Sequence, residues 1–454
     1  MELTRELGNF IVQTDYDNLP AEIQQAAKER LLDTIGAMIA GRAGWAYGDA
    51  LIAAMKNLGS GTCSVIGPDH GSCFPAARAA MINAAFAHAI ELDDGHKFAG
   101  VHAGAVIIPT ALAIGQDVGA TGKEILAAIV IGYEIVYRLA VAQSPDLIER
   151  GFHPSATCGT VGAMAVAGKL LGLNEQQMAN GLGMSVLQAS GMMEATVSGQ
   201  QSKCVMVGNS AFNGIACAYV AQAGLEGCLT AFEGKTGLFH GMSRCIAPEE
   251  VTAGLGRDYW IVDTYNKFYP TCRHAQPAIE AVLDLAVEYD IDPAQVERIL
   301  VGTHHVAYEL TGLIYEPKNP GEAKFSIPYG VAAALVDHGV AVRHLEKQAF
   351  QNKKYLDLAQ KVQVFIDEKI NGLYPKKRGA QIQITLKDGT IYSRECFDLK
   401  GSPQNPVNFD ALKNKFVISA TNLLSNESIA KIQQLCTEFE RGKEVSQLLS
   451  LLNW

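Results

Sequence analysis

Helical periodicity runs through the long first part of this chain and limits its fold more than any other feature. From Ala21 to about Gly256, apolar residues recur every three or four positions in one segment after another. Segments 158–171, 175–189 and 208–224 show this period and are rich in small residues, so their helices can pack closely. This part of the chain is predicted to be all-helical.

The length of the chain favours more than one domain. It has 454 residues, of which 48% are apolar and 19% are charged. One hydrophobic core rarely serves so long a chain, and the composition is that of a well-buried globular protein. Thr121, followed three positions later by Glu124, has the pattern of a capping box that opens a helix.

The pattern changes near Asp263. Helical period returns at 277–288, and Val296–Val306 is then rich in β-branched residues, as a strand would be. Phe325–Val340 is predicted to be helical again.

A hairpin is expected close to the end of this second region. Residues 380–397 alternate apolar and polar side chains around Asp388-Gly389, a favoured turn pair. From Phe409 onward the chain is predicted to be helical. The fold class is therefore mainly α: a large all-helical domain (1–265 plus 401–454) with an inserted smaller α+β lid domain (266–400). The cleft between two such domains is a common place for a small-molecule site.

Charge and cysteine content exclude several classes of function. The net charge is −10 and no stretch is rich in lysine and arginine, so we expect no nucleic-acid partner. The ten cysteines include no C-x-x-C pair, so neither a zinc ribbon nor a common iron–sulfur motif is present. Scattered, reduced thiols fit a cytoplasmic protein.

The sequence also lacks the usual signals for export and for nucleotide binding. Met1–Phe10 has no apolar core of a signal peptide, and Glu134 and Arg138 interrupt the most apolar stretch, so we expect no membrane segment. Glu233-Gly234-Lys235-Thr236 resembles the end of a P-loop, but Leu229 stands where its first glycine is needed. Gly181-Leu182-Gly183 lacks the third glycine of a dinucleotide-binding turn.

The most polar interruption of the helical region is a segment rich in carboxylates and histidines. Glu91, Asp93, Asp94, His96 and His102 lie close together between two apolar helical segments. A carboxylate beside an imidazole sets its tautomer and raises its pKa, as a general base requires. Two alternatives remain open: a solvated loop without chemistry, and a divalent metal held by Asp93, Asp94 and His96.

Two further polar positions precede helices. His153 stands just before a helix start, where backbone N–H groups attract anions, although it could be a plain capping histidine. Gln200, Gln201 and Lys203 end a loop before the next helix. A lysine there can pair with a substrate carboxylate, or be simply exposed.

The predicted domain junction carries several basic groups. Lys267, Cys272, Arg273 and His274 lie within one short segment that a proline stiffens. Lys324 and Tyr329 lead into a helix of the smaller domain; a buried tyrosine usually just satisfies its hydroxyl. The pair His304-His305 and the single residues His338 and His344 are interpreted as structural.

Four cations, Lys203, Lys267, Arg273 and Lys324, would give an acidic protein the local positive charge that a polycarboxylate needs. Removing a proton beside a carboxylate builds dianionic charge on it, and fixed cations lower that cost.

These segments together resemble the MmgE/PrpD family. The likeness runs in order along nearly the whole chain and is carried by segments such as ELDDGH…HAGAVIIPTALAIG, GFHPSATCGTVGAMAVAGKLLGL, QQSKCVMVGNSAFNG, KFYPTCRHAQPAIEA and EAKFSIPYGVAAAL. The family includes 2-methylcitrate dehydratase, cis-aconitate decarboxylase and iminodisuccinate epimerase. The resemblance implies a helical domain with an inserted α+β lid, a homodimer, and no metal or organic cofactor.

The resemblance also implies roles for particular residues. Active-site roles are implied for Asp93, His102, His153, Lys203, Lys267 and Tyr329. Substrate binding is expected of Glu91, Gln200, Cys272, Arg273, His274 and Lys324. Departures from the family pattern are Glu91 for the first aspartate of the acidic motif, Gly95 for a threonine, and Ala103 for a proline.

The resemblance favours a metal-independent hydro-lyase acting next to a carboxylate of a small di- or tricarboxylic acid. In this hypothesis His102 removes the proton, Lys203, Lys267 and Arg273 hold carboxylates, and His153 or Tyr329 assists the departing hydroxyl. Decarboxylation or epimerisation by the same α-carbon chemistry is the alternative. A non-catalytic carboxylate-binding protein is a third hypothesis, because fold alone does not fix function.

Overall fold

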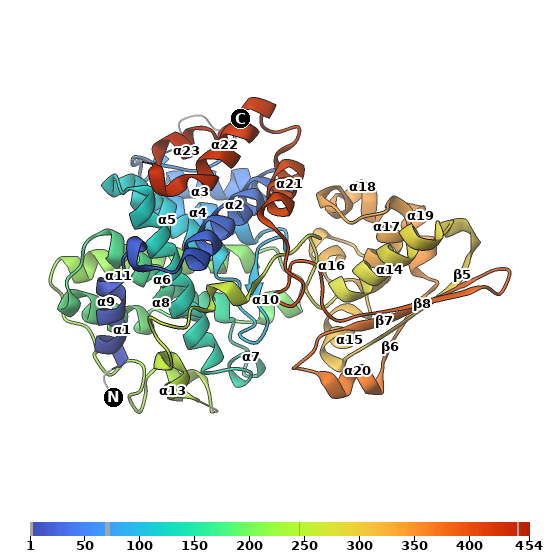
Figure 1. The fold of residues 1–454 in the computed structure, drawn as a ribbon, viewed down its shortest axis with the longest axis horizontal. Coiled ribbons are helices and arrows are strands. Elements are labelled where there is room, and N and C mark those ends of the chain that lie inside the picture. Colours follow the sequence, from blue (N-terminus) through green and yellow to red (C-terminus); the bar gives the residue numbers. More distant parts are fainter. Residues whose placement is uncertain (1–2, 69–72, 245, 443–444) are drawn as a thin grey trace.

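The structure, a computed structural model, describes all residues except 1–2, 69–72, 245 and 443–444. It is mainly α, as predicted, and has two lobes (Figure 1). We call the larger one, which contains α1–α13 and α21–α23, the helical lobe, and the smaller one, from α14 to β8, the sheet lobe. The predicted domain boundaries at 265 and 400 stay a prediction.

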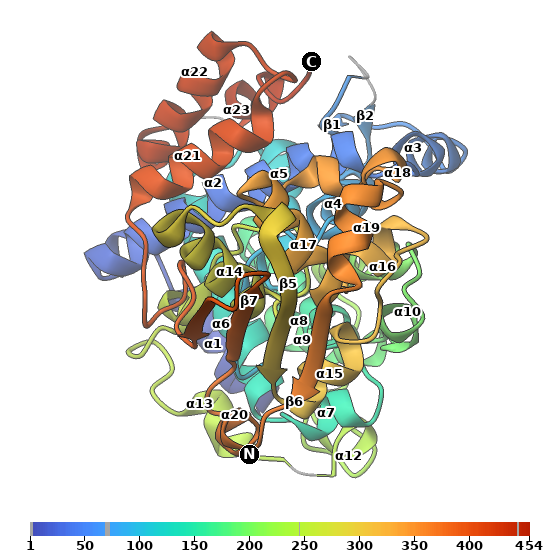
Figure 2. The same cartoon turned by 90° about the vertical axis from the view of Figure 1, so that its right-hand side faces the viewer.

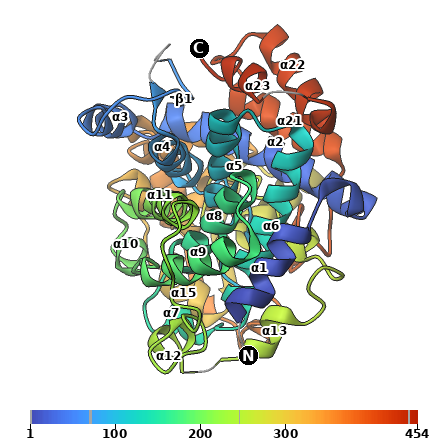
Figure 3. The same ribbon diagram turned by 90° about the vertical axis from the view of Figure 1, so that its left-hand side faces the viewer.

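The core of the helical lobe consists of long helices, most of them largely buried (Figure 3). They are α4 (Ala76–His88), α5 (Gly104–Val118), α6 (Gly122–Val141), α8 (Pro154–Leu170) and α11 (Lys203–Gln222). Small residues allow their close packing: a Cβ at Gly208 of α11 would lie 2.4 Å from the Met81 carbonyl oxygen of α4. This contact brings the start of α11 close to the end of α4.

Further helices surround this core. They are α1 (Leu3–Gln13), α2 (Ala21–Gly44), α9 (Glu175–Leu187), α21 (Phe409–Ala420), α22 (Asn426–Thr437) and α23 (Ser446–Ser450). The C-terminal helices, red in Figure 1, return from the sheet lobe, and α21 packs on α2, where Phe416 lies against Gly36. Thr121 and Glu124 form the predicted capping box of α6.

The sheet lobe contains a four-stranded sheet in the order β6-β5-β7-β8 (Figure 2). Its strands are β5 (Val296–Thr303), β6 (Val362–Ile366), β7 (Ala380–Leu386) and β8 (Ile391–Cys396). Strands β5 and β6 are parallel, whereas β7 is antiparallel to both β5 and β8. The larger helices of the lobe, α14 (Gln276–Tyr289), α17 (Ile327–Asp337) and α19 (Lys353–Ala359), lie together on one side of the sheet (Figure 1).

Short elements connect these parts. The helices are α3 (Gly48–Lys56), α7 (Asp146–Glu149), α10 (Glu194–Val197), α12 (Leu238–Met242), α13 (Pro248–Thr252), α15 (His305–Thr311), α16 (Pro320–Lys324), α18 (Lys347–Phe350) and α20 (Glu368–Leu373). Two-residue strands form the pairs β1 (Cys63–Ser64) with β2 (Cys73–Phe74) and β3 (Gly95–His96) with β4 (Thr264–Tyr265).

The predicted elements of the sheet lobe are present with shifted ends. The 380–397 hairpin is confirmed, and Gly389 at its turn has a φ of +88°. The strand predicted to reach Val306 ends at Thr303, because the His304 side chain accepts a hydrogen bond from the Ala307 N–H and caps α15. His304 and His305 therefore do not lie on a strand.

Helix α11 is long and apolar enough to cross a bilayer by length and composition. Just over half of its apolar window (56%) is buried inside the protein, against α4 and α8. Its apolar character is that of a core helix. The nine cysteines among the described residues are all free thiols, and Cys245 lies outside those residues.

Candidate active site

A short ribbon joins the acidic segment to the predicted domain junction. Strands β3 and β4 pair Gly95 with Tyr265 and His96 with Thr264. This pairing places the carboxylates of residues 91–94 beside Lys267, which follows β4 by two positions. A side chain at position 95 has no room, because a Cβ there would lie 2.5 Å from the Tyr265 hydroxyl.

Glu91 is the centre of a buried ion-pair network. Its Oε2 lies 2.9 Å from the Lys267 Nζ, and its Oε1 pairs with the Lys203 Nζ. Burial alone would raise the pKa of Glu91, but the two ammonium groups outweigh burial and hold the pKa well below its ordinary value. Glu91 also has a φ of +57°, a left-handed conformation that costs a non-glycine residue about 1 kcal/mol or more.

Asp93 links the lysine pair to the histidines. Its Oδ2 lies 2.6 Å from the His88 Nδ1, and its Oδ1 lies 3.6 Å from the Lys267 Nζ. Burial raises its pKa, but His88, His102 and Lys267 together lower it below the ordinary range. The two carboxylates in turn raise the pKa of Lys267 against the effect of burial. Asp93 and Lys267 are therefore both charged at neutral pH.

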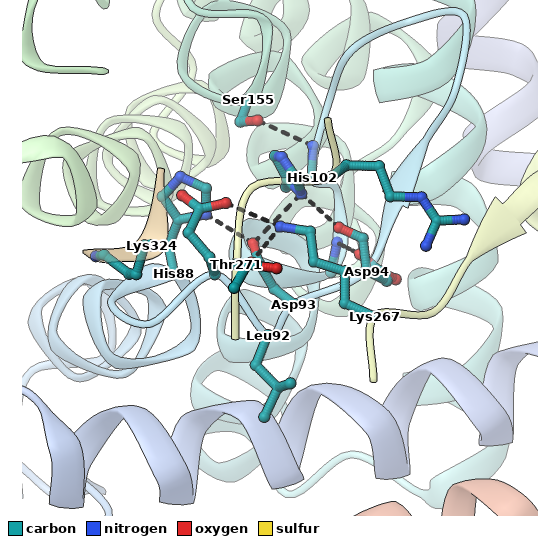
Figure 4. Close-up of polar contacts among 12 residues, drawn as sticks. His88, Leu92, Asp93, Asp94, His102, Ser155, Lys267, Thr271 and Lys324 are labelled. Carbon is teal, nitrogen blue, oxygen red and sulfur yellow. Dashed lines mark hydrogen bonds and ion pairs between the residues drawn. The ribbon is translucent and has the colours of Figure 1, made fainter. Parts of the chain in front are cut away.

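His102 is held as a neutral imidazole with one free nitrogen (Figure 4). Its Nδ1 lies 2.6 Å from the Asp94 backbone carbonyl, which can only accept, so the proton is on Nδ1. Its backbone N–H donates to the Ser155 hydroxyl at 2.9 Å. Burial and the nearby Lys267 lower its pKa to about 3. Among the described residues no hydrogen bond reaches its Nε2, but the lowered pKa makes this imidazole a weak base, contrary to the raised pKa that the sequence analysis expects of a general base.

Asp94 has a structural role. Its side chain accepts hydrogen bonds from the Tyr133 hydroxyl at 2.5 Å and from the Gly104 N–H at 3.1 Å. Burial raises its pKa to about 6. These contacts fix the loop whose backbone carbonyl orients His102.

A narrow pocket lies beside this cluster, between α4, α10, the start of α11 and α16. Its charged lining residues are Lys203 and Lys324, together with the imidazole of His88. Three buried polar atoms of its lining have no hydrogen-bond partner among the described residues: His88 Nε2, Thr196 Oγ1 and Gln201 Nε2. Buried polar groups are normally satisfied, so these atoms indicate a pocket built for a polar ligand.

Most of the predicted site residues line this pocket or contact the ion-pair network around Glu91. Gln200, Lys203 and Lys324 line it, and the Lys324 Nζ donates to the Ala89 carbonyl at 2.8 Å. Burial lowers the pKa of Lys324. His153 caps the start of α8, and its ring lies 5.8 Å from that of His88. Its Nδ1 is also buried without a partner.

Other predicted residues lie elsewhere. The Tyr329 hydroxyl donates to the His344 carbonyl at 2.8 Å inside the sheet lobe, so it satisfies its own hydroxyl there. Arg273 stacks on the Tyr265 ring at 4.2 Å and lines a second pocket. The His274 ring packs on His304, 5.2 Å away. Cys272, by contrast, lies near the cluster: its backbone N–H donates to the Lys324 carbonyl at 2.8 Å, and burial, together with the nearby Glu91, raises the pKa of its thiol to about 11.

Neither alternative for the acidic segment fits the geometry. The solvated loop is wrong, because Glu91, Asp93 and Asp94 are at most 3% exposed. The Asp93 and Asp94 carboxylates turn to different partners, and the His96 Nδ1 accepts from the Ala99 N–H. Within the part of the chain that the structure describes, no three His, Cys, Asp or Glu side chains converge as metal ligands.

The sequence analysis missed His88, Tyr133 and Ser155, which hold Asp93, Asp94 and His102 in place. His88 ends the alanine-rich α4 directly before the acidic segment. A histidine at the end of an otherwise apolar helix was the signal that could have identified it.

Acidification should destabilise the protein, because many of its imidazoles are held neutral. Burial, named first among the causes, lowers the pKa of His88, His96, His102, His153, His274 and His304. Below about pH 6.5 the unfolded chain binds protons that the folded protein does not, so folding stability falls as pH falls. Burial raises the pKa values of four carboxyl groups, Asp94, Glu134, Asp263 and Glu280, which oppose this trend but are fewer than the six imidazoles.

The expected result is a lower urea midpoint at pH 5.5 than at pH 7.5. Each net proton contributes about 1.4 kcal/mol per pH unit. An unchanged or higher midpoint at pH 5.5 would show that these imidazoles are not held neutral.

Gly321 closes the pocket from the sheet-lobe side. A Cβ there would lie 2.2 Å from the Gly199 carbonyl oxygen, a backbone atom that cannot turn aside. Gly321→Ala should push α16 and its Lys324 away, and we expect a loss of kcat/KM of about 10-fold or more from the misplaced cation. Gly339→Ala is the matched control, because a Cβ at Gly339 meets nothing within 4 Å. Equal kinetics of the two variants would contradict the expected role of this contact.

Comparison with known proteins assigns both halves of the chain to one family. The family model of the MmgE/PrpD N-terminal domain matches residues 5–249, and that of the MmgE/PrpD C-terminal domain matches residues 269–439. Cis-aconitate decarboxylase of Aspergillus terreus is 27% identical over 99% of this chain and 96% of its own length. The enzymes of that name from Homo sapiens and Mus musculus are each 26% identical over 99% of the chain, and 94% and 93% of their own lengths are covered.

Proposed function

Because the chain belongs to the MmgE/PrpD family, we propose that it is a lyase that decarboxylates a small unsaturated tricarboxylate of the cis-aconitate kind. The relatives named above are all called cis-aconitate decarboxylases, and they are similar along the full length of the chain. They support decarboxylation, the alternative from the sequence, better than the dehydration that the sequence analysis favours.

The observation that carries the proposal is the pocket between Lys203 and Lys324. Two ammonium groups and three buried polar atoms without partners face one narrow space. Carboxylates bind such groups well, because a fixed ammonium lowers the energy of a nearby anion strongly in a water-poor site. A compact polycarboxylate therefore fits the pocket better than a neutral or cationic ligand does.

Decarboxylation of an unsaturated acid breaks the bond between a carbon and its carboxylate. Carbon dioxide leaves, and the electron pair moves into the conjugated alkene and the carboxylate attached to it. A proton must then be added to carbon, so one proton enters for each carbon dioxide released. In our proposal Lys203 holds the carboxylate on which the charge accumulates, and its positive charge stabilises the transition state.

We assign the proton delivery to Lys324. Its Nζ donates only to the Ala89 carbonyl among the described residues, and burial lowers its pKa. An ammonium with a lowered pKa releases its proton more readily, which is what a general acid needs. Bulk water returns the proton to Lys324 after each turnover.

The free Nε2 of His102 favours a second candidate function. Its imidazole has a fixed tautomer that leaves Nε2 to take a proton next to a carboxylate, which dehydration or epimerisation requires and decarboxylation does not. Its low pKa makes it a weak base, and it is not among the described residues that line the Lys203 pocket. The hydro-lyase hypothesis from the sequence therefore remains the second candidate, with His102 as its base.

We further propose that the sheet lobe acts as a lid. Its α16 contributes Lys324, and the next residue contributes the Phe325 ring, to a pocket whose other walls belong to the helical lobe. Opening the contact between the lobes would give a substrate access, and closing it would bring Lys324 back.

One assay separates these functions. The full-length protein is incubated in deuterated buffer, with a chelator, with cis-aconitate and separately with 2-methylcitrate, and the products are followed by NMR and carbon dioxide release. The proposal predicts carbon dioxide and one deuterium on carbon per cis-aconitate consumed. A new alkene from 2-methylcitrate without carbon dioxide supports the second candidate. Turnover of neither acid by folded protein would defeat both.

A further inference from the structure

A second narrow pocket is lined by both lobes and, among the described residues, shares no lining residue with the Lys203 pocket. Its lining includes Lys97 from the helical lobe, Arg378 and Phe397 from the sheet lobe, and Tyr265 and Arg273 from the connection between them. The proposed decarboxylation does not use this space, although the sequence analysis expects Arg273 to hold a substrate carboxylate.

Three cations share this pocket, and among the described residues none of them forms an ion pair. The Arg273 guanidinium stacks on the Tyr265 ring at 4.2 Å and donates to the Gln276 Oε1 at 2.9 Å. Arg378 donates from Nη2 to the Lys97 carbonyl at 2.5 Å, and its buried Nε has no partner. The donors of Arg378 are therefore only partly used.

The nearest carboxylates do not neutralise these cations. Glu280 and Asp398 are close enough to favour the charged forms of Arg273 and Lys97, respectively, but neither is within ion-pair distance. The Glu280 Oε1 instead accepts the Lys400 N–H at 2.8 Å. In a protein of net charge −10, unpaired cations around one pocket require an explanation.

We propose that this pocket binds a small, multiply charged anion, with carboxylate or phosphate oxygens between Arg273, Arg378 and Lys97. Guanidinium groups bind such oxygens in pairs, and the rigid stacking of Arg273 on Tyr265 leaves its remaining N–H groups available. Among the described residues, no His, Asp or Glu side chain lines this space, so the ligand is bound and not transformed.

An anion at this position would act on the arrangement of the lobes. Lys97 follows the acidic segment of the helical lobe, whereas Arg378 immediately precedes β7 of the sheet lobe. One ligand that contacts both would hold them together. The Tyr265 ring, which forms a wall of this pocket, reaches Gly95 with its hydroxyl, so the ligand also supports the backbone next to Asp94.

The test measures anion binding to the full-length protein by calorimetry, with inorganic phosphate and with citrate as probes. All variants are made in a Lys203→Met background, which weakens binding to the first pocket. In this background at least one probe should bind. Arg378→Gln and Arg273→Gln should each weaken that binding at least 10-fold, and Arg298→Gln, an exposed arginine on β5 of the same lobe, should leave it unchanged.

Each outcome decides the proposal. Binding of phosphate alone or citrate alone identifies the chemistry of the ligand. The proposal is overturned if Lys203→Met abolishes all binding, since the first pocket would then be the anion site. It is also overturned if Arg378→Gln and Arg298→Gln bind the probe equally. Circular dichroism and urea midpoints confirm that the compared variants are folded. Activity on cis-aconitate is a separate readout, so failure here leaves the proposed function intact.

Discussion

Replacing Lys203 by methionine should lower kcat/KM on cis-aconitate by about 10²–10³-fold, the size of loss that follows removal of one preorganised electrostatic contact. The Lys203 side chain is 12% exposed and lines the pocket directly, whereas Lys267 is fully buried behind Glu91. Methionine keeps a chain of similar length and shape but carries no charge. The fall in kcat/KM should therefore measure how much the positive charge of Lys203 stabilises the substrate carboxylate in the transition state.

Two variants control this experiment. Lys203→Arg keeps the charge and should recover part of the activity, although its planar guanidinium changes the contact geometry. Lys169→Met removes a partly buried lysine from α8 that pairs with Asp15 outside the pocket, and its kinetics should match the wild type. A Lys203→Met protein with more than a third of the original kcat/KM would show that this ammonium does not hold the substrate.

The acidic segment could be identified as a candidate site from sequence because it is highly charged, whereas the helical segments on both sides of it are apolar. Several carboxylates between two apolar helices must be either solvated or paired, and the resemblance favoured the second. Asp93, His102, Lys203 and Lys267 indeed meet, since Glu91 connects the two lysines and Asp93 connects Lys267 to the histidines. Charges that are distant in sequence can be predicted to meet when each lacks a local partner.

Sequence could not show which way a side chain points. Tyr329 lies in a segment that supports the family resemblance, but its hydroxyl turns into the sheet lobe toward the His344 carbonyl. Arg273 follows Lys267 by six positions, yet it stacks on Tyr265 and lines the second pocket. His88 was missed for the converse reason: its helix looks like plain core, and only the packing of α4 against α11 turns its end toward the pocket.

Replacing Lys267 by methionine should cost about 3–5 kcal/mol of folding stability, the loss expected when one partner of a buried ion pair is removed. Lys267 is fully buried, 2.9 Å from the Glu91 carboxylate and 3.6 Å from that of Asp93. Without it, two buried carboxylates share only Lys203 and the neutral imidazoles. The urea midpoint should fall strongly, with little change in slope.

Neutralising Glu91, the buried carboxylate left without Lys267, should then restore part of the lost folding stability. The double variant Lys267→Met/Glu91→Gln should be more stable than Lys267→Met by at least about 1 kcal/mol, a coupling typical of residues in one buried network. Lys415→Met is the matched control, because Lys415 is an equally buried lysine that pairs with Asp33 at 2.6 Å in the helical lobe. It too should destabilise the protein, but adding Glu91→Gln should bring no recovery. If Glu91→Gln rescues both lysine variants, or neither, then the Glu91–Lys267 pair is not what stabilises this cluster.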